Sequence, residues 1–229
     1  MKKLIETKDL RQVFGEKSVV GFFLAPALMK LMKLDKINKL YDKVADFQGR
    51  ECLEAFLAEM RITYEIPSTD LANLPKEGPF ITVSNHAYGG LDGIILMHLV
   101  SEERPDLKVI VNFLLSRIKP LENFFLPVNA FDKNVSSRSS IKGIRLAKES
   151  LQNGSPLGLF PAGEVSHIGP SGQVEDLPWH TPIVKFIQNA GVPVVPIYFG
   201  GHNSARFMRR AKIHPMLQTA SLPAEVLNK

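Results

Sequence analysis

His86 and Asp92, six positions apart, are the first residues in this chain whose types suggest shared chemistry. They lie in the segment Ser84-Asn85-His86-Ala87-Tyr88-Gly89-Gly90-Leu91-Asp92-Gly93. An imidazole readily exchanges a proton near neutral pH, and a nearby carboxylate fixes its tautomer and stabilises its charged form. The pair therefore suits general-base catalysis. A structural histidine beside an aspartate that caps a helix explains the same spacing equally well.

A second polar cluster follows another apolar run. It reads Leu159-Phe160-Pro161-Ala162-Gly163-Glu164-Val165-Ser166-His167. Polar residues gathered after a predicted strand and a Pro-Ala-Gly turn can present backbone N–H groups and the Glu164 carboxylate to a ligand. An ordinary surface loop is the competing interpretation.

The elements around these clusters predict an α/β fold. Strands are expected at 79–85, 107–113, 156–160 and 192–199, a broken apolar run at 121–129, and helices at 91–100, 139–153 and 181–190. Strands that alternate with helices of this length favour a mainly parallel central sheet flanked by helices. Ligands in such sheets bind beyond the carboxyl ends of the strands, where both polar clusters fall.

The start of the chain has a different pattern, which predicts an N-terminal amphipathic helical region over 1–62 and an α/β domain over 63–229. From Pro26, interpreted as a first-turn residue, apolar residues recur at spacings of three and four as far as Val44, with lysines mostly off that stripe. This predicts one basic amphipathic helix, and the pattern of residues 47–60 predicts a second helix. The stripe could bind an anionic membrane surface or pack on the protein's own core. The apolar run 19–29 is too short to span a bilayer, which needs about 20 residues.

The composition limits the class of protein. With 45% apolar and 22% charged residues, the 229-residue chain is typical of a globular protein. A net charge of +5 indicates an anionic partner, which could be lipid, an acidic carrier protein or nucleic acid. The single cysteine, Cys52, excludes an internal disulfide, and we expect it to be a buried apolar residue in a reducing compartment. Residues 1–16 are polar and predict no secretory signal.

Together the clusters resemble the glycerolipid acyltransferase family. Its lysophosphatidic acid acyltransferases carry a His-x4-Asp block, a phosphate-binding Arg block, an F-P-E-G block and a V-P-(I/V)-x-P block, in that order. At the corresponding places stand Asn85 to Asp92, Ala130 to Lys133, Phe160 to Glu164 and Val192 to Ile197. The resemblance spans about residues 78–201, and the order of the blocks makes it more specific than any one of them.

Three departures separate the chain from that pattern. Five residues rather than four lie between His86 and Asp92, and Ala162 replaces the family's glutamate while Glu164 follows the glycine. Lys133 stands where the phosphate-binding arginine usually does, which loses the bidentate guanidinium fork. These features resemble the branch often labelled haemolysin-like, whose members are similar to acyltransferases of amino-acid-containing lipids. The acceptor therefore need not carry a phosphate.

The resemblance implies an O-acyltransferase that moves a fatty acyl group from acyl carrier protein or coenzyme A to the hydroxyl of a lyso-lipid. His86 would be the general base, Asp92 would orient it, and backbone amides around Gly163 would stabilise the oxyanion. The substrate-binding residues expected are Asn85, Gly89, Gly90, Lys133, Gly163, Glu164 and Ser166. We expect a peripheral or monotopic protein on the cytoplasmic face of an anionic membrane, without a metal, a cofactor or a nucleic-acid partner.

Two other functions remain open at this stage. A thioesterase or lipase-type hydrolase needs an activated nucleophile or a site for a reactive water, and the sequence shows no G-x-S-x-G elbow. A non-catalytic, haemolysin-like membrane-binding protein would depend on residues 19–44 and leave the four blocks unexplained. The basic residues from Lys133 to Arg145 suit either a solvated helix face or the docking of a carrier protein or lipid headgroups. Residues 200–229 are helical in tendency, and the resemblance predicts a further strand beyond them, so the chain could be a fragment.

Overall fold

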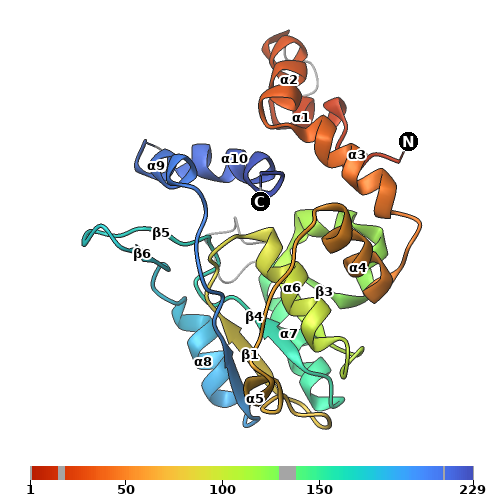
Figure 1. Cartoon of the computed structure of the whole chain (residues 1–229), viewed down its shortest axis with the longest axis vertical. Helices are drawn as coiled ribbons and strands as arrows, with labels where there is room; N and C mark the ends of the chain where they lie inside the picture. Colours follow the sequence, from red (N-terminus) through yellow and green to blue (C-terminus); the bar gives the residue numbers. More distant parts are fainter. Residues whose placement is uncertain (1, 15–18, 129–137, 214, 229) are drawn as a thin grey trace.

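A parallel five-stranded sheet forms the centre of the computed structural model, which describes residues 2–14, 19–128, 138–213 and 215–228 (Figure 1). The strand order is β3-β2-β4-β1-β7. The strands are β1 (Ile81–Ser84), β2 (Lys108–Asn112), β3 (Phe125–Val128), β4 (Leu157–Leu159) and β7 (Val194–Ile197), and all neighbours pair in parallel. The predicted α/β class with a mainly parallel sheet is confirmed.

Helices cover both faces of the sheet. The helices are α4 (Gly49–Glu59), α6 (Gly90–Val100), α7 (Arg138–Gln152) and α8 (Thr181–Asn189), which confirms the four predicted in these regions. One apolar cluster joins α4 and α6 to the sheet through residues such as Leu53, Leu96 and Val109. A second cluster joins α7 and α8 to the sheet through residues such as Leu151 and Phe186.

Some short elements were not predicted. They are α5 (Ser68–Leu71), the 3-10 helices η1 (Phe113–Arg117) and η2 (Lys119–Phe124), and the antiparallel pair β5 (His167–Ile168) and β6 (Val174–Glu175). Residues 121–128 of the broken apolar run form the end of η2 followed directly by β3, and residue 129 lies outside the described ranges. An apolar run of this length is compatible with either element, so the sequence pattern alone does not separate them.

Strand β1 determines where the site lies. All four of its residues are buried, because β4 and β7 pair with its two edges and helices cover its faces. Ile81 is in register with Leu157 of β4 and with Val194 of β7. The carboxyl ends of these three strands therefore meet at one edge, which brings three of the four sequence blocks together.

The N-terminal region forms helices α1 (Thr7–Phe14), α2 (Val19–Leu31) and α3 (Leu34–Val44) before α4. The prediction of one continuous helix from Pro26 to Val44 is wrong. Lys33 has a left-handed conformation with φ 54°, which an α-helix of L-residues cannot propagate, so it separates α2 from α3. Pro26 lies inside α2 rather than in a first turn. Within the described ranges, no helix has the length and apolarity needed to cross a bilayer.

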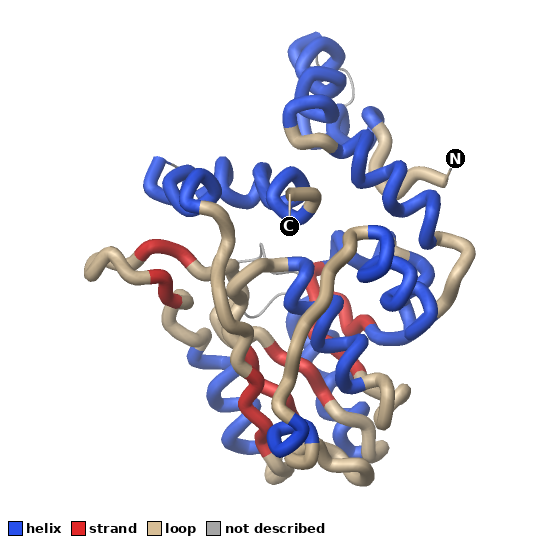
Figure 2. The backbone as a smooth tube through the Cα atoms, viewed as in Figure 1, coloured by secondary structure: helices blue, strands red, loops and turns tan. Residues whose placement is uncertain are grey.

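The C-terminal residues form a helical hairpin of α9 (Ala205–Ile213) and α10 (Pro215–Val226). It lies beyond the carboxyl ends of the strands, as do α1 and α2 (Figures 1 and 2). The Glu225 carboxylate of α10 accepts hydrogen bonds from the backbone N–H and the hydroxyl of Ser204, at 2.6 and 2.9 Å, just before α9 begins. Lys33 donates to the Asn228 side chain at 3.1 Å, which connects the hairpin to the N-terminal helices.

Candidate active site

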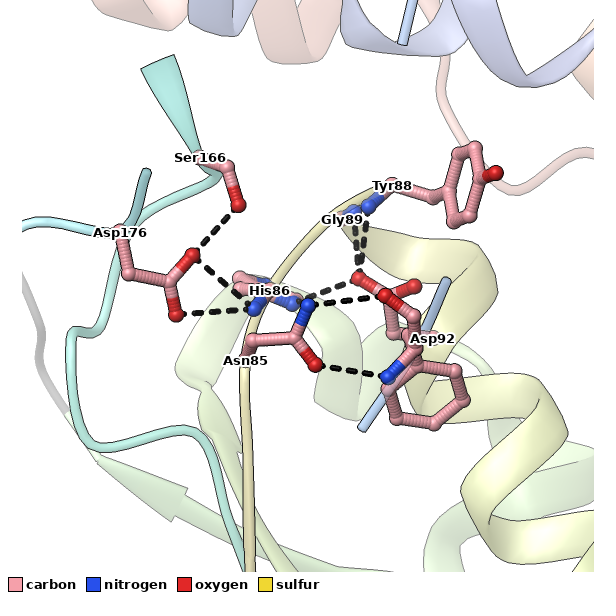
Figure 3. A network of polar contacts seen from close by, with 8 residues as sticks. Asn85, His86, Tyr88, Gly89, Asp92, Ser166 and Asp176 are labelled. Atoms are coloured by element: carbon pink, nitrogen blue, oxygen red, sulfur yellow. Dashed lines mark hydrogen bonds and ion pairs between the residues drawn. The ribbon is translucent and has the colours of Figure 1, made fainter. Parts of the chain in front are cut away.

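The carboxyl end of β1 holds the His86 and Asp92 side chains next to each other. His86 follows the strand by two residues, and Asp92 lies in the first turn of α6. The distance from His86 Nδ1 to Asp92 Oδ2 is 3.1 Å (Figure 3). Asp92 is buried, whereas 18% of the His86 side chain is exposed. The two side chains are thus in contact, and the imidazole remains accessible.

Asp92 organises the turn as well as the imidazole. Its Oδ2 atom accepts the backbone N–H groups of Tyr88 at 2.8 Å and Gly89 at 3.0 Å. A carboxylate is favoured at this place because the N-terminus of a helix carries partial positive charge. The Asp92 carboxylate oxygen can accept a hydrogen bond from Nδ1–H of His86 in the same way. The lone pair of the imidazole then lies on Nε2, the nitrogen needed for a base.

Gly89 accommodates the extra residue between His86 and Asp92. It adopts φ 80° and ψ −125°, a conformation that residues with a Cβ atom rarely take. A Cβ atom here would lie 2.9 Å from Leu222 Cδ1 of α10 and 3.1 Å from Val165 Cγ2. Five intervening residues are therefore compatible with contact between the His86 and Asp92 side chains, since the turn that joins them closes through a glycine. Gly90 begins α6, is exposed, and has open space where a Cβ atom would be.

Asn85 connects the ends of two strands. Its Nδ2 donates to the Phe199 carbonyl at 2.9 Å, and its Oδ1 accepts the Phe199 N–H at 2.7 Å. Phe199 follows β7, the strand of the fourth block. The Asn85 amide therefore fixes the loop that carries His86. Its predicted part in substrate binding stays a prediction.

The Phe160 ring packs against the imidazole. The ring centroids of His86 and Phe160 are 4.4 Å apart with the planes inclined by 36°, and the Phe199 ring stacks behind Phe160 at 6.3 Å. Phe160 follows β4 directly, so the third block lies beside the first. This contact covers one face of the imidazole. The sequence placed Phe160 in a block but gave its side chain no role.

The loop of the third block also holds the His86 backbone. The N–H of Ser166 donates to the His86 carbonyl at 2.9 Å, and Ser166 is buried. Gly163 has φ 69° and donates its N–H to the Phe160 carbonyl, so this amide closes a turn. An oxyanion site would need neighbouring amides and stays a prediction. Glu164 is exposed on the same loop, and Lys133 lies outside the described residues.

Asp176 completes this network, and sequence reasoning missed it. Its Oδ2 and Oδ1 atoms lie 3.1 and 3.3 Å from the His86 backbone nitrogen, and the Ser166 hydroxyl donates to Oδ1 (Figure 3). Both backbone polar groups of His86 are thereby fixed. Asp176 follows the short strand β6 and is 90 positions from His86, so no local pattern points to it.

The thiol of Cys52 takes no part in the hydrogen bonds of this network. Cys52 is buried, and burial raises the pKa of its thiol to about 11, so the thiol stays protonated and inert. The predicted role of Cys52 as a buried apolar residue is confirmed. Within the ranges that the structure describes, no three His, Cys, Asp or Glu side chains come close enough to hold a metal ion.

A parallel α/β sheet with an imidazole and a carboxylate at the carboxyl end of a central strand matches what the acyltransferase resemblance implies. The chain belongs to the acyltransferase family, since the family model described as "Acyltransferase" matches residues 15–223. It is 31% identical over 213 residues to a lyso-glycine lipid O-acyltransferase of Bacteroides thetaiotaomicron, covering 92% of this chain and 74% of that protein. It is 26% identical over 215 residues to a lyso-glycine lipid O-acyltransferase of Phocaeicola vulgatus, covering 93% of this chain and 72% of that protein. The predicted family is confirmed, and the predicted branch is supported in outline.

Proposed function

We propose that the protein transfers a fatty acyl group from a thioester to the hydroxyl of a lyso-lipid, with His86 as the general base. The observation that carries this proposal is the 3.1 Å contact between an accessible imidazole and a buried carboxylate. It occurs in a chain of the acyltransferase family. Asp92 orients the imidazole and stabilises the imidazolium that forms during the reaction.

The proposed reaction is a direct transfer. His86 Nε2 takes the proton of the acceptor hydroxyl while the hydroxyl oxygen attacks the thioester carbonyl carbon. The tetrahedral intermediate then collapses, the carbon–sulfur bond breaks, and the leaving thiolate takes the proton from the imidazolium. The products are an ester and a free thiol, and no residue of the protein is acylated. Proton transfer of this kind contributes roughly 10²- to 10⁴-fold to a rate.

The acceptor that we propose is a lyso-lipid with an amino-acid headgroup. Two relatives are named lyso-glycine lipid O-acyltransferases, which supports this choice over a lyso-phospholipid. Lys133 in place of the family's arginine supports it too, since the lysine lacks the bidentate fork that suits phosphate. Acyl carrier protein and coenzyme A are both suitable donors, and no further cofactor enters the proposed reaction.

We further propose that the protein works as a peripheral or monotopic protein on the cytoplasmic face of a membrane. Leu24 and Leu31 of α2 are 44% and 76% exposed, and α2 is apolar over most of its length. The net charge of +5 suits an anionic lipid surface. The α3 part of the predicted stripe packs inward instead, since Leu34 and Val44 are buried and Ile37 and Tyr41 are partly buried.

The test is an acyl-transfer assay on vesicles that contain either lyso-glycine lipid or lysophosphatidic acid. Each kind of vesicle is assayed with acyl-coenzyme A and, separately, with acyl carrier protein loaded with the same acyl chain. Mass spectrometry identifies the products. We expect the O-acylated glycine lipid and one equivalent of free thiol. Acylation of lysophosphatidic acid alone would refute the proposed acceptor. Free fatty acid without ester would identify a hydrolase and refute the transfer.

A further inference from the structure

Helix α9 has one buried face and one basic face. Phe207 and Met208 are buried, while Arg206 and Arg209 are exposed and Arg210 is partly buried. The three arginines follow the spacing i, i+3, i+4, which places them on one side of a helix. The helix sequence contains no acidic residue that could neutralise them. We call these three arginines the basic face of α9.

The basic face belongs to a helical hairpin, α9 and α10, that contacts two loops of the candidate active site. Leu222 of α10 lies against Gly89, and the Gln218 side chain donates to the Ser166 carbonyl at 3.4 Å. Glu225 of α10 holds the residue just before α9, so the two helices are linked by hydrogen bonds. A surface that binds α9 is therefore brought close to the edge of the sheet where His86 lies.

The apolar helix α2 lies on the same side of the sheet. Figures 1 and 2 show that α1, α2, α9 and α10 all lie beyond the carboxyl ends of the strands. The hydrogen bond from Lys33 to Asn228 joins the two helical groups. An apolar helix with exposed leucines and a helix with arginines but no acidic residue, both beyond the same edge of the sheet, together suit an anionic bilayer surface, which offers acyl chains and negative headgroups at once.

We propose that the basic face of α9 binds anionic lipid headgroups and so turns the candidate active site toward the bilayer that contains the acceptor. The inference rests on the proposed function, because an enzyme that acylates a lyso-lipid must meet it at a membrane. It assigns a second docking element, which is separate in sequence from α2 and adjacent to α10, the helix that contacts Gly89 and Ser166.

The test compares Arg206→Gln/Arg209→Gln with the wild type in sedimentation with vesicles rich in phosphatidylglycerol. Each basic residue near an anionic surface strengthens partitioning about fivefold, so we expect the double variant to bind about 30-fold more weakly. The difference should shrink at high salt and on phosphatidylcholine vesicles. Arg206→Lys/Arg209→Lys keeps the charge and should restore binding.

A matched control removes the same charge elsewhere. Lys148 and Lys185 are exposed on α7 and α8, which cover one face of the sheet. Lys148→Gln/Lys185→Gln should leave vesicle binding within about twofold of the wild type, since surface charges more than a Debye length from the membrane are screened. An equal loss in this control, or unchanged binding of the arginine variant, would refute the docking role of α9.

Three further measurements separate this inference from its alternatives. If the arginine variant binds vesicles normally but has a raised KM for acyl carrier protein and not for acyl-coenzyme A, the face binds the carrier protein and the membrane assignment is wrong. Vesicle binding of His86→Ala should equal that of the wild type. If the wild type binds vesicles through α9 but forms no ester, the proposed function fails while the docking surface stands.

Discussion

Replacing Asp92 by asparagine removes a charge from the centre of the site with almost no change in size. Oδ2 accepts three N–H groups, from His86, Tyr88 and Gly89, at 3.1, 2.8 and 3.0 Å. The amide oxygen of asparagine can occupy that place. Its NH₂ group must then lie where Oδ1 does, a buried position without a hydrogen-bond partner among the described residues. A buried, unsatisfied donor costs about 1 to 3 kcal/mol of stability.

The same substitution removes electrostatic stabilisation from the imidazolium that forms in the proposed reaction. A full charge pair at 3.1 Å is worth at most about 5 kcal/mol at an effective dielectric constant of about 20. Only part of that charge has developed in the transition state, and the neutral amide keeps a hydrogen bond. We therefore expect a loss of about 3 kcal/mol, or about 100-fold in kcat. KM should change little, because the interaction is made mainly in the transition state.

Thiol release from the acyl donor, checked by mass spectrometry of the ester, gives kcat and KM, and thermal unfolding gives Tm. At roughly 2 to 4 °C per kcal/mol for a chain of this size, Asp92→Asn should lower Tm by about 2 to 12 °C. Asp106→Asn is the matched control, because Asp106 pairs with Arg104 at 2.8 Å, at the start of β2 and thus at the amino edge of the sheet. It should lower Tm and leave kcat unchanged. A folded Asp92→Asn with wild-type kcat, or an equal kcat loss in Asp106→Asn, would refute the reasoning.

Three further outcomes are expected. Asp176→Ala frees the His86 N–H, so kcat should fall at least about tenfold, and Asp176→Asn should recover part of it in steady-state assays. Gly89→Ala forces a Cβ atom into a positive-φ position against Leu222, which should cost about 1 to 3 kcal/mol in denaturant unfolding; a normal midpoint would contradict this. Burial, and to a smaller extent the charge of Arg50, hold the pKa of His98 in the folded protein below its value in the unfolded chain. The contribution of His98 to stability is therefore complete above the unfolded pKa and is lost as pH falls through the folded pKa. Wild-type Tm should therefore drop between about pH 7 and about pH 5, and His98→Phe should flatten that slope, while an unchanged slope would exclude His98 as the cause.

Much of the fold was predictable because local patterns determine it. The strand before His86 and its neighbours are short apolar runs bounded by turn residues, and α6 and α7 begin and end within two residues of their predicted bounds. Parallel pairing of β1 with β4 and β7 then brings three sequence blocks to one edge. The contact between His86 and Asp92 follows from a strand end and a helix start joined by a glycine turn.

The parts that were not predicted depend on distant contacts or on single backbone angles. Asp176 reaches His86 from an irregular segment after a two-residue strand, and Leu222 reaches Gly89 from a helix near the C-terminus. Neither contact leaves a periodic signal in the sequence. The break between α2 and α3 depends on one left-handed residue, Lys33, whose neighbours continue the helical pattern on both sides.

The rate of ester formation by His86→Ala tests the central claim most directly. The variant and the wild type are compared on the same vesicles, with the same thioester and lyso-lipid, after equal vesicle binding and equal Tm have been verified. The proposed base predicts a loss of roughly 10²- to 10⁴-fold, with no acylated protein in either sample. Turnover by His86→Ala comparable to that of the wild type would contradict the role assigned to this imidazole.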